Sequence, residues 1–185
     1  MCNVPPAVQR QLSEALAIIS KSDFPAKWTE LLPELVSKFS LQDFAVTNGV
    51  LATTNSVMKR FRWQVKSDEL FTELKYCLEQ LQDPLTKLFI ATATQVQQLS
   101  ANPAASGNPG AYRQLMPMMD ALRTMSRIFY SLNWQDLPEY FEDHIKEWMD
   151  VFLQFMSFKN ATLSDPDEED EPGPIEKLQT AIVQN

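Results

Sequence analysis

The segment from Asp23 to Phe39 constrains the fold more than any other, because it joins a proline corner to an amphipathic helix. Pro25 ends the preceding helix, since proline lacks a backbone N–H and disfavours helical geometry in the residue before it. Apolar residues then recur at helical spacing on one face, namely Trp28, Leu31, Leu32, Leu35 and Phe39. Two helices joined in this way cannot bury their apolar faces alone, so the unit needs neighbours of the same kind.

The rest of the chain supplies such neighbours. No stretch alternates apolar and polar residues with a period of two, which predicts an all-α protein. The expected helices pair consecutively as 6–21 with 25–39, 43–63 with 67–100, and 111–131 with 138–158. A helix, a corner and a second helix recurring every ~40–55 residues are typical of HEAT-type α-solenoids. We therefore expect a segment of a right-handed α-solenoid built from antiparallel helix pairs.

This pattern divides the chain into three expected HEAT-type repeats at about 6–39, 43–100 and 111–158, within residues 1–158. Residues 159–174 form an expected linker, because the acidic run from Asp165 to Glu171 can bury nothing. Residues 175–185 then begin the first helix of a further repeat, for which the sequence offers no partner.

Local signals place several helix ends and irregularities. Asp43 and Ser67 are expected N-caps, because their side chains can accept from the first free N–H groups of a helix. Pro33 requires the second helix to begin near Trp28 or Thr29, so that its missing N–H falls close to the first turn. Pro84 should bend the fourth helix without ending it, since the apolar spacing resumes directly afterwards.

Two further helices are predicted from their apolar faces. The first helix should turn one stripe into the core, and the sixth should run without a break from Pro138 to Phe158. The stripe expected on the first helix consists of Val8, Leu12, Ala15, Leu16 and Ile19.

Charge and cysteine content limit the function classes. The net charge of −8 disfavours a general nucleic-acid binder and favours a basic or mixed partner. Cys2 and Cys77 do not make a disulfide framework, and Cys77 has the surroundings of a small buried residue. No signal peptide and no apolar run of about 20 residues are present, so we expect no membrane insertion and a nuclear or cytoplasmic location.

The sequence does not predict an enzyme. The sole histidine, His144, follows two acids on one helix, but adjacent helical residues do not face each other, and a packing role is expected. The four glycines form no phosphate-binding loop, and no nucleophile motif is present. We therefore expect no catalytic residue, no metal and no cofactor.

The basic run from Lys59 to Lys66, with Phe61 and Trp63 interleaved, has two interpretations. It could contact nucleic acid or act as a localisation signal. It could equally be a helix C-terminus whose cations complement the helix dipole, with both aromatic rings turned into the core. The acidity of the remaining chain favours the second interpretation.

Three groups of segments resemble a known family. They are Gln11–Ile19 running into Asp23–Trp28, Asn48–Leu51 with Lys59–Arg62, and Phe129–Asp143, and together they span most of residues 9 to 159. The first group is similar to the karyopherin-β nuclear transport receptors in general. The second and third, in this order and spacing, resemble the members of that family that export importin-α.

The resemblance implies a segment of the N-terminal arch of such a receptor, with the second helix of each pair on the concave side. It implies shuttling between nucleus and cytoplasm, with Ran in its GTP form, importin-α and nuclear pore repeats as partners and without nucleic acid. Partner contacts are then expected on the polar faces of the second and fourth helices. The candidate partner-binding residues are Lys27, Glu30, Glu34, Lys38, Asp68, Thr72, Lys75 and Glu79.

Two departures and two alternatives accompany the resemblance. The loop from Ser100 to Tyr112 is longer than in the relatives, so no function is placed on it. The first repeats and the C-terminal arch are missing, so binding by this segment alone is not expected. An import receptor of the same family is one alternative, and a HEAT scaffold without a transport role is the other.

Overall fold

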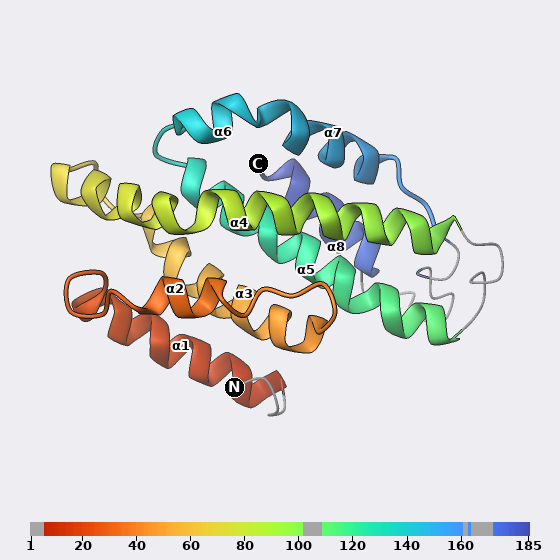
Figure 1. Ribbon diagram of the computed structural model, residues 1–185, viewed down its shortest axis with the longest axis horizontal. Coiled ribbons are helices and arrows are strands. Elements are labelled where there is room, and N and C mark those ends of the chain that lie inside the picture. Colours follow the sequence, from red (N-terminus) through yellow and green to blue (C-terminus); the bar gives the residue numbers. More distant parts are fainter. Residues whose placement is uncertain (1–5, 102–108, 161–162, 164–171) are drawn as a thin grey trace.

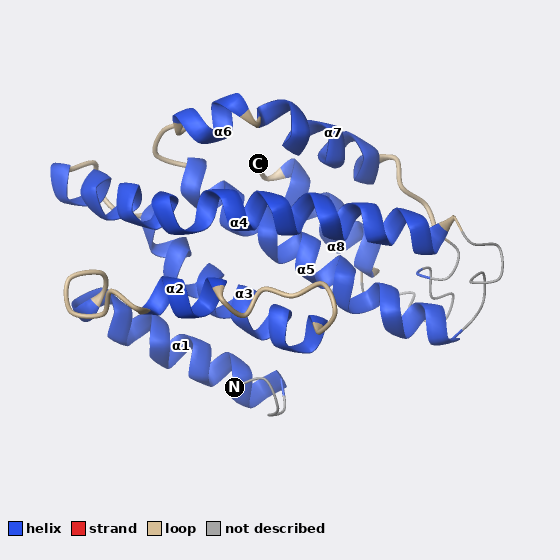
Figure 2. Cartoon of the chain, in the orientation of Figure 1, coloured by secondary structure: helices blue, strands red, loops and turns tan. Residues whose placement is uncertain are grey.

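A computed structural model describes residues 6–101, 109–160, 163 and 172–185, and every regular element in these ranges is helical, as predicted (Figure 2). The predicted acidic run and most of the loop after Ser100 lie outside the described residues. The elements are α1 (Pro6–Asp23), α2 (Leu31–Val36), α3 (Phe44–Met58), the 3-10 helix η1 (Lys59–Arg62), α4 (Asp68–Ser100), α5 (Pro109–Asn133), α6 (Glu139–Asp143), α7 (Ile145–Met156) and α8 (Pro174–Val183).

The helices form two layers (Figure 1). In one layer α3 packs between α1 and α5, and α5 packs between α3 and α8. In the other layer α4 packs against α2 on one side and α7 on the other, and it also packs on α5. Successive helix pairs therefore stack on their neighbours as in a solenoid. The exact division into three repeats stays a prediction.

An aromatic cluster joins the two layers. Trp148 on α7 is fully buried and lies between Phe89 of α4 and Phe129 of α5, with ring centroids 4.2 Å and 4.4 Å away. Its Nε1 donates a hydrogen bond to Thr86 Oγ1 over 3.1 Å, so its one polar atom is satisfied. Phe152 packs edge-on against both phenylalanine rings. Three helices thus meet around a single indole.

The N-caps that the sequence predicts at Asp43 and Ser67 are confirmed. Asp43 Oδ1 accepts from the Val46 N–H over 3.0 Å, and Ser67 Oγ accepts from the Leu70 N–H over 3.1 Å. Pro84 lies within α4, which continues to Ser100 as predicted. These ends depend on one side chain and the backbone three residues ahead, which is why the sequence could place them.

The second and sixth expected helices are shorter than predicted. Regular helix in the second begins at Leu31 rather than near Trp28 or Thr29, which makes Pro33 the third helical residue, where no N–H is required. The sixth is broken at His144, whose φ of −102° and ψ of 10° separate α6 from α7. The His144 Nδ1 lies 2.8 Å from the Tyr140 carbonyl oxygen, and the two rings stack, which holds the break in place.

The predicted apolar stripe of α1 is not in the core. Val8 and Leu12 are each 39% exposed, and Ile19 is 46% exposed. The helix packs on α3 through a face of small residues instead, where Ser13 and Ser20 are buried and Ser13 Oγ lies 3.5 Å from Thr53 Oγ1. Periodicity identifies an apolar stripe but does not say which face a neighbour covers, and small residues allow closer helix packing.

The final helix, α8, packs against other helices of the chain, although the sequence analysis expected no neighbour for it. α8 packs against α5 and α7 with Leu178, Ala181 and Ile182 buried. The Gln179 Nε2 also donates to the carbonyl oxygens of Phe155 and Met156, each over 3.2 Å. α8 therefore extends the α1, α3, α5 layer.

A single tyrosine ties the chain before α2 to α4. The Tyr76 hydroxyl donates to the Thr29 carbonyl oxygen over 2.5 Å, and the Tyr76 ring packs against Phe24 with centroids 5.8 Å apart. Tyr76 is half-buried, and it fixes the corner to the helix.

We expect Trp148→Ala to lower the free energy of unfolding by about 3–5 kcal/mol, because it leaves a cavity between three helices. Urea denaturation followed by circular dichroism measures the change. Leu153→Ala is the matched control on the same helix, since Leu153 is 69% exposed, and it should change stability by at most about 0.5 kcal/mol. Equal effects of the two substitutions would contradict the central role of Trp148.

Tyr76→Phe should cost about 0.5–1.5 kcal/mol, because it removes the hydrogen bond to Thr29 and leaves the ring packing against Phe24 intact. The same urea titration measures it. Tyr76→Ala should cost more than Tyr76→Phe, since the ring contact is then lost as well. If the two variants have the same stability, the ring does not hold the corner.

Candidate partner-binding surface

The candidate residues before and around α2 do not form one helical face. Lys27 lies in the turn before α2, Glu30 is the N-cap residue, Glu34 is within the helix and Lys38 follows its end. The prediction of one polar helix face over 27–38 is therefore wrong in its geometry. All four side chains are nevertheless exposed on the chain segment that packs against α4.

The candidates on α4 do share a face. Asp68, Thr72, Lys75 and Glu79 follow each other at spacings of four, three and four residues, which places them in one row along a helix. All four are exposed. Thr72 Oγ1 donates to the Asp68 carbonyl oxygen over 2.8 Å, so this hydroxyl is already engaged within the helix.

Tyr76 brings the two groups of candidates together. Burial raises the pKa of its phenol above the ordinary value, and Cys77 and the Glu30 carboxylate raise it further. Its hydroxyl donates to the carbonyl oxygen of Thr29, the residue before Glu30, and Tyr76 itself follows Lys75 directly on α4. The residues of the corner and the row on α4 are thus parts of one surface. Sequence reasoning missed Tyr76, although an aromatic ring on an otherwise polar helix face is a signal of contact.

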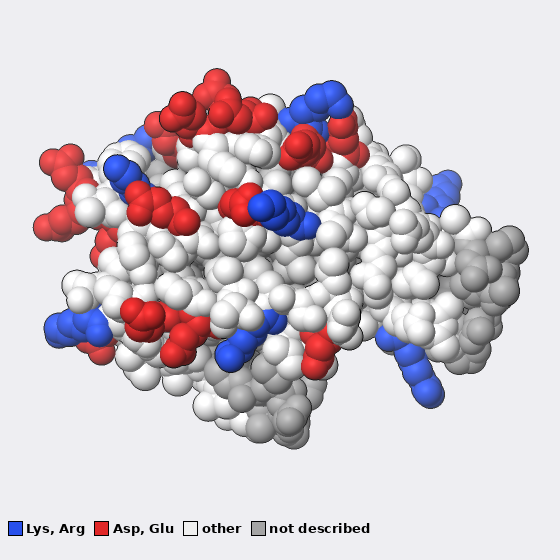
Figure 3. Space-filling model, in the orientation of Figure 1, with Lys and Arg blue, Asp and Glu red and all other residues white. Residues whose placement is uncertain are grey.

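The layer that carries α2, α4, α6 and α7 has an excess of acidic groups on its outer side (Figure 3). Its exposed acids gather over the start of α4 and over α6, and they include Asp68, Glu69, Glu139, Glu142 and Asp143. Several lysines there are paired within the chain, as in Lys27 with Asp23 at 3.6 Å and Lys146 with Asp150 at 2.6 Å. Such exposed ion pairs add little stability, so the two side chains of each pair can leave one another and bind another protein instead.

No catalytic or metal centre emerges in the part of the chain that the structure describes. No group of three or more His, Cys, Asp and Glu side chains there could hold a metal ion. Burial raises the pKa of the Cys77 thiol, which keeps it protonated and unreactive. No described helix has the length and apolarity needed to cross a membrane.

The basic run after α3 is only partly what the sequence predicted. Phe61 is fully buried, as expected, but Trp63 is 85% exposed, so the prediction that both rings turn into the core was wrong. Arg62 is held by α5, where its Nε donates to Ser131 Oγ over 2.9 Å and its Nη2 to the Arg127 carbonyl oxygen over 2.8 Å. Contacts with α5 thus hold Arg62 in place, whereas the neighbouring Trp63 remains exposed to solvent.

A family model and the most similar curated proteins point to the same protein family. The Cse1 family model matches residues 57–185. Exportin-2 from Homo sapiens and from Mus musculus are each 43% identical to the chain over all 185 residues, and exportin-2 from Danio rerio is 41% identical. The chain spans only 18% of the length of each of these relatives.

The fold agrees with the same family. The solved structure described as the exportin Cse1 in its cargo-free, cytoplasmic state superposes with a TM-score of 0.89 at 33% identity, covering 98% of this chain and 19% of that one. The layered helix pairs are accordingly a segment of an α-solenoid of HEAT type. With a family model matching most of its residues and this structural agreement, the chain belongs to the Cse1 family.

Proposed function

We propose that this chain is a segment of a nuclear export receptor that binds importin-α together with Ran in its GTP form and carries it from nucleus to cytoplasm. The observation that carries the proposal is the 43% identity to exportin-2 along the entire chain. A receptor of this kind needs no chemistry of its own, which is consistent with the class of solenoid proteins that bind partners over extended surfaces. It would shuttle through nuclear pores and contact their repeats.

Within the segment, we propose that partners bind the surface joined by Tyr76. Its candidate residues carry four carboxylates against three lysines, and the carboxylates of Glu30, Glu34 and Glu79 suit basic groups on a partner of mixed charge. The chemistry does not suit a nucleic acid, because phosphate groups would meet these carboxylates. Exposed and weakly paired side chains are available for such contacts without first breaking the core.

A pull-down with the full-length protein tests the export function. Importin-α should be captured when Ran is loaded with a non-hydrolysable GTP analogue and not when Ran is loaded with GDP. Capture that Ran-GTP abolishes would favour an import receptor. Failure to bind Ran and nuclear pore repeats would favour a HEAT scaffold without a transport role.

Charge reversal tests the surface. Changing Glu30, Glu34 and Glu79 together to Lys should weaken binding of Ran and importin-α to the receptor by at least about tenfold, because lysines then face the basic groups of the partner. Titration calorimetry or surface plasmon resonance measures the affinity. Circular dichroism should show an unchanged helix content, since all three side chains are exposed.

A matched control makes the same number of charge reversals on the same layer but on α6 and α7, at Glu142, Asp143 and Glu147. These carboxylates are exposed and lie outside the candidate surface. The control should change the affinity by less than about threefold, which corresponds to the small effect of distant surface charges. If both triple variants bind equally well, the proposed surface is not the binding surface.

A further inference from the structure

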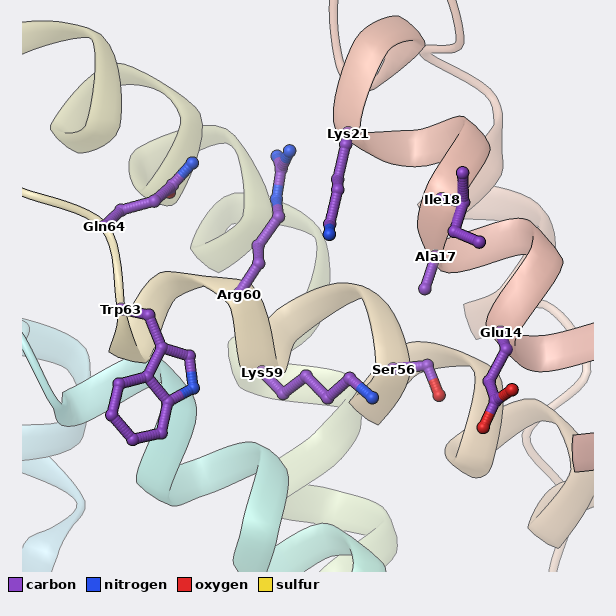
Figure 4. A pocket seen from close by; sticks show the side chains of 9 residues that line it. All are labelled: Glu14, Ala17, Ile18, Lys21, Ser56, Lys59, Arg60, Trp63 and Gln64. Carbon is purple, nitrogen blue, oxygen red and sulfur yellow. The ribbon is translucent and has the colours of Figure 1, made fainter.

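A groove of about 670 Å³ lies between α1 and the end of α3 with η1, on the opposite layer from the surface discussed above (Figure 4). One side is formed by α1, with Glu14, Ile18 and Lys21. The other side is formed by the residues from Ser56 to Gln64 that line it. None of these residues belongs to the candidate surface for Ran and importin-α.

Three cations line the groove against a single acid. Lys21 extends from α1 toward η1, and Lys59 and Arg60 come from the opposite side (Figure 4). Arg60 is a fixed part of the wall, since its Nη2 pairs with Glu73 Oε2 at 2.9 Å and its side chain is only 9% exposed. Lys21 and Lys59 form no ion pair with any residue that the structure describes. Arg60 is thus neutralised by Glu73, and Lys21 and Lys59 are the cations of the groove that remain unpaired, with Glu14 as the one carboxylate among its lining residues.

Exposed apolar side chains flank these cations. Trp63 is 85% exposed beside η1, and Ile18 is 66% exposed on α1. Large apolar groups of this kind, tryptophan above all, contribute most of the binding energy where proteins meet.

The Nε of Arg60 is also buried without a hydrogen-bond partner among the described residues, so one donor of the wall is unsatisfied.

The groove is separate from the exposed apolar stripe of α1. Ile18 follows Glu14 by four residues and precedes Lys21 by three, so these three side chains share one face of the helix. Leu12 and Ile19 point to a different side, because helical geometry rotates each residue by about 100° from the last. A neighbour packed on the stripe would therefore leave the groove open.

We infer that this groove binds an acidic peptide segment carrying an aromatic or large aliphatic residue. The carboxylates would pair with Lys21 and Lys59, and the apolar side chain would pack on Trp63 at the η1 end of the groove (Figure 4). This inference rests on the groove alone and is independent of the proposed export function. It concerns the other layer, so its failure leaves the assignment of the Ran surface untouched.

A peptide fits the groove better than a nucleic acid does. A phosphate backbone carries a charge at every nucleotide and is bound by cations arranged along its path. Here the cations meet at one place, and Glu14 lies on the same wall as Lys21. A short segment with a few carboxylates matches this arrangement, whereas a longer polyanion would also meet the acidic remainder of the chain.

Fluorescence anisotropy with the full-length protein provides the test. The probe is a short labelled peptide in which Asp and Glu flank a central Phe, and it should show saturable binding that weakens as salt is raised. A peptide with Gln and Asn in place of the acids, and one with Ala in place of Phe, should each bind at least about fivefold more weakly. A neutral Phe peptide that binds equally well would overturn the inference, as would a single-stranded oligonucleotide that binds more tightly.

Variants locate the site. Lys21→Glu with Lys59→Glu should weaken binding of the acidic peptide by at least about tenfold, and Trp63→Ala by about fivefold. The matched controls are Lys146→Glu with Lys159→Glu, which reverse two exposed lysines elsewhere, and Trp134→Ala, which removes another exposed indole. The controls should stay within about twofold of the unmodified protein. Absence of saturable binding, or equal losses in groove and control variants, would refute the site.

Discussion

The sandwich of Trp148 between Phe89 and Phe129 is the interaction on which the arrangement of the helices depends most. Each of the three rings comes from a different helix, so the contact cannot form within one helix pair and requires both layers at once. Stacked and edge-on rings have preferred geometries, which fixes the angles between α4, α5 and α7 more narrowly than aliphatic packing would. The hydrogen bond to Thr86 adds a directional constraint, because a buried indole N–H without a partner would be costly.

Because this aromatic core holds the two layers together from within, their outer surfaces can differ in charge. The layer of α2, α4, α6 and α7 is acidic on its outer side, and the groove between α1 and η1 on the other layer is locally basic. Both surfaces consist mainly of exposed side chains that contribute little to stability. A solenoid built in this way can engage different partners on opposite sides without disturbing its packing, which is how repeat proteins commonly divide structural and binding roles.

The sequence predicted those features that depend on neighbouring residues. The caps at Asp43 and Ser67 were predictable because a side chain and the N–H three residues ahead decide them. The exposed stripe of α1 was not predictable, because packing on α3 through Ser13 and Ser20 depends on the neighbour's shape. The break at His144 was missed for a related reason, since a ring stack and one hydrogen bond decide it. For the candidate surface, exposure could be predicted, but the contact of Tyr76 with Thr29 could not, because it joins residues far apart in the sequence.

The uninterrupted course of α4 has a mechanical consequence. At 33 residues and 1.5 Å per residue, the helix is about 50 Å long, and it carries the Tyr76 contact in its first part and the aromatic sandwich near Phe89 farther along. Pro84 lies between these two contacts and removes a helical hydrogen bond there, so α4 bends most easily between them. A partner that displaced the corner before α2 would therefore move the first part of α4 relative to a second part that the aromatic sandwich holds in place.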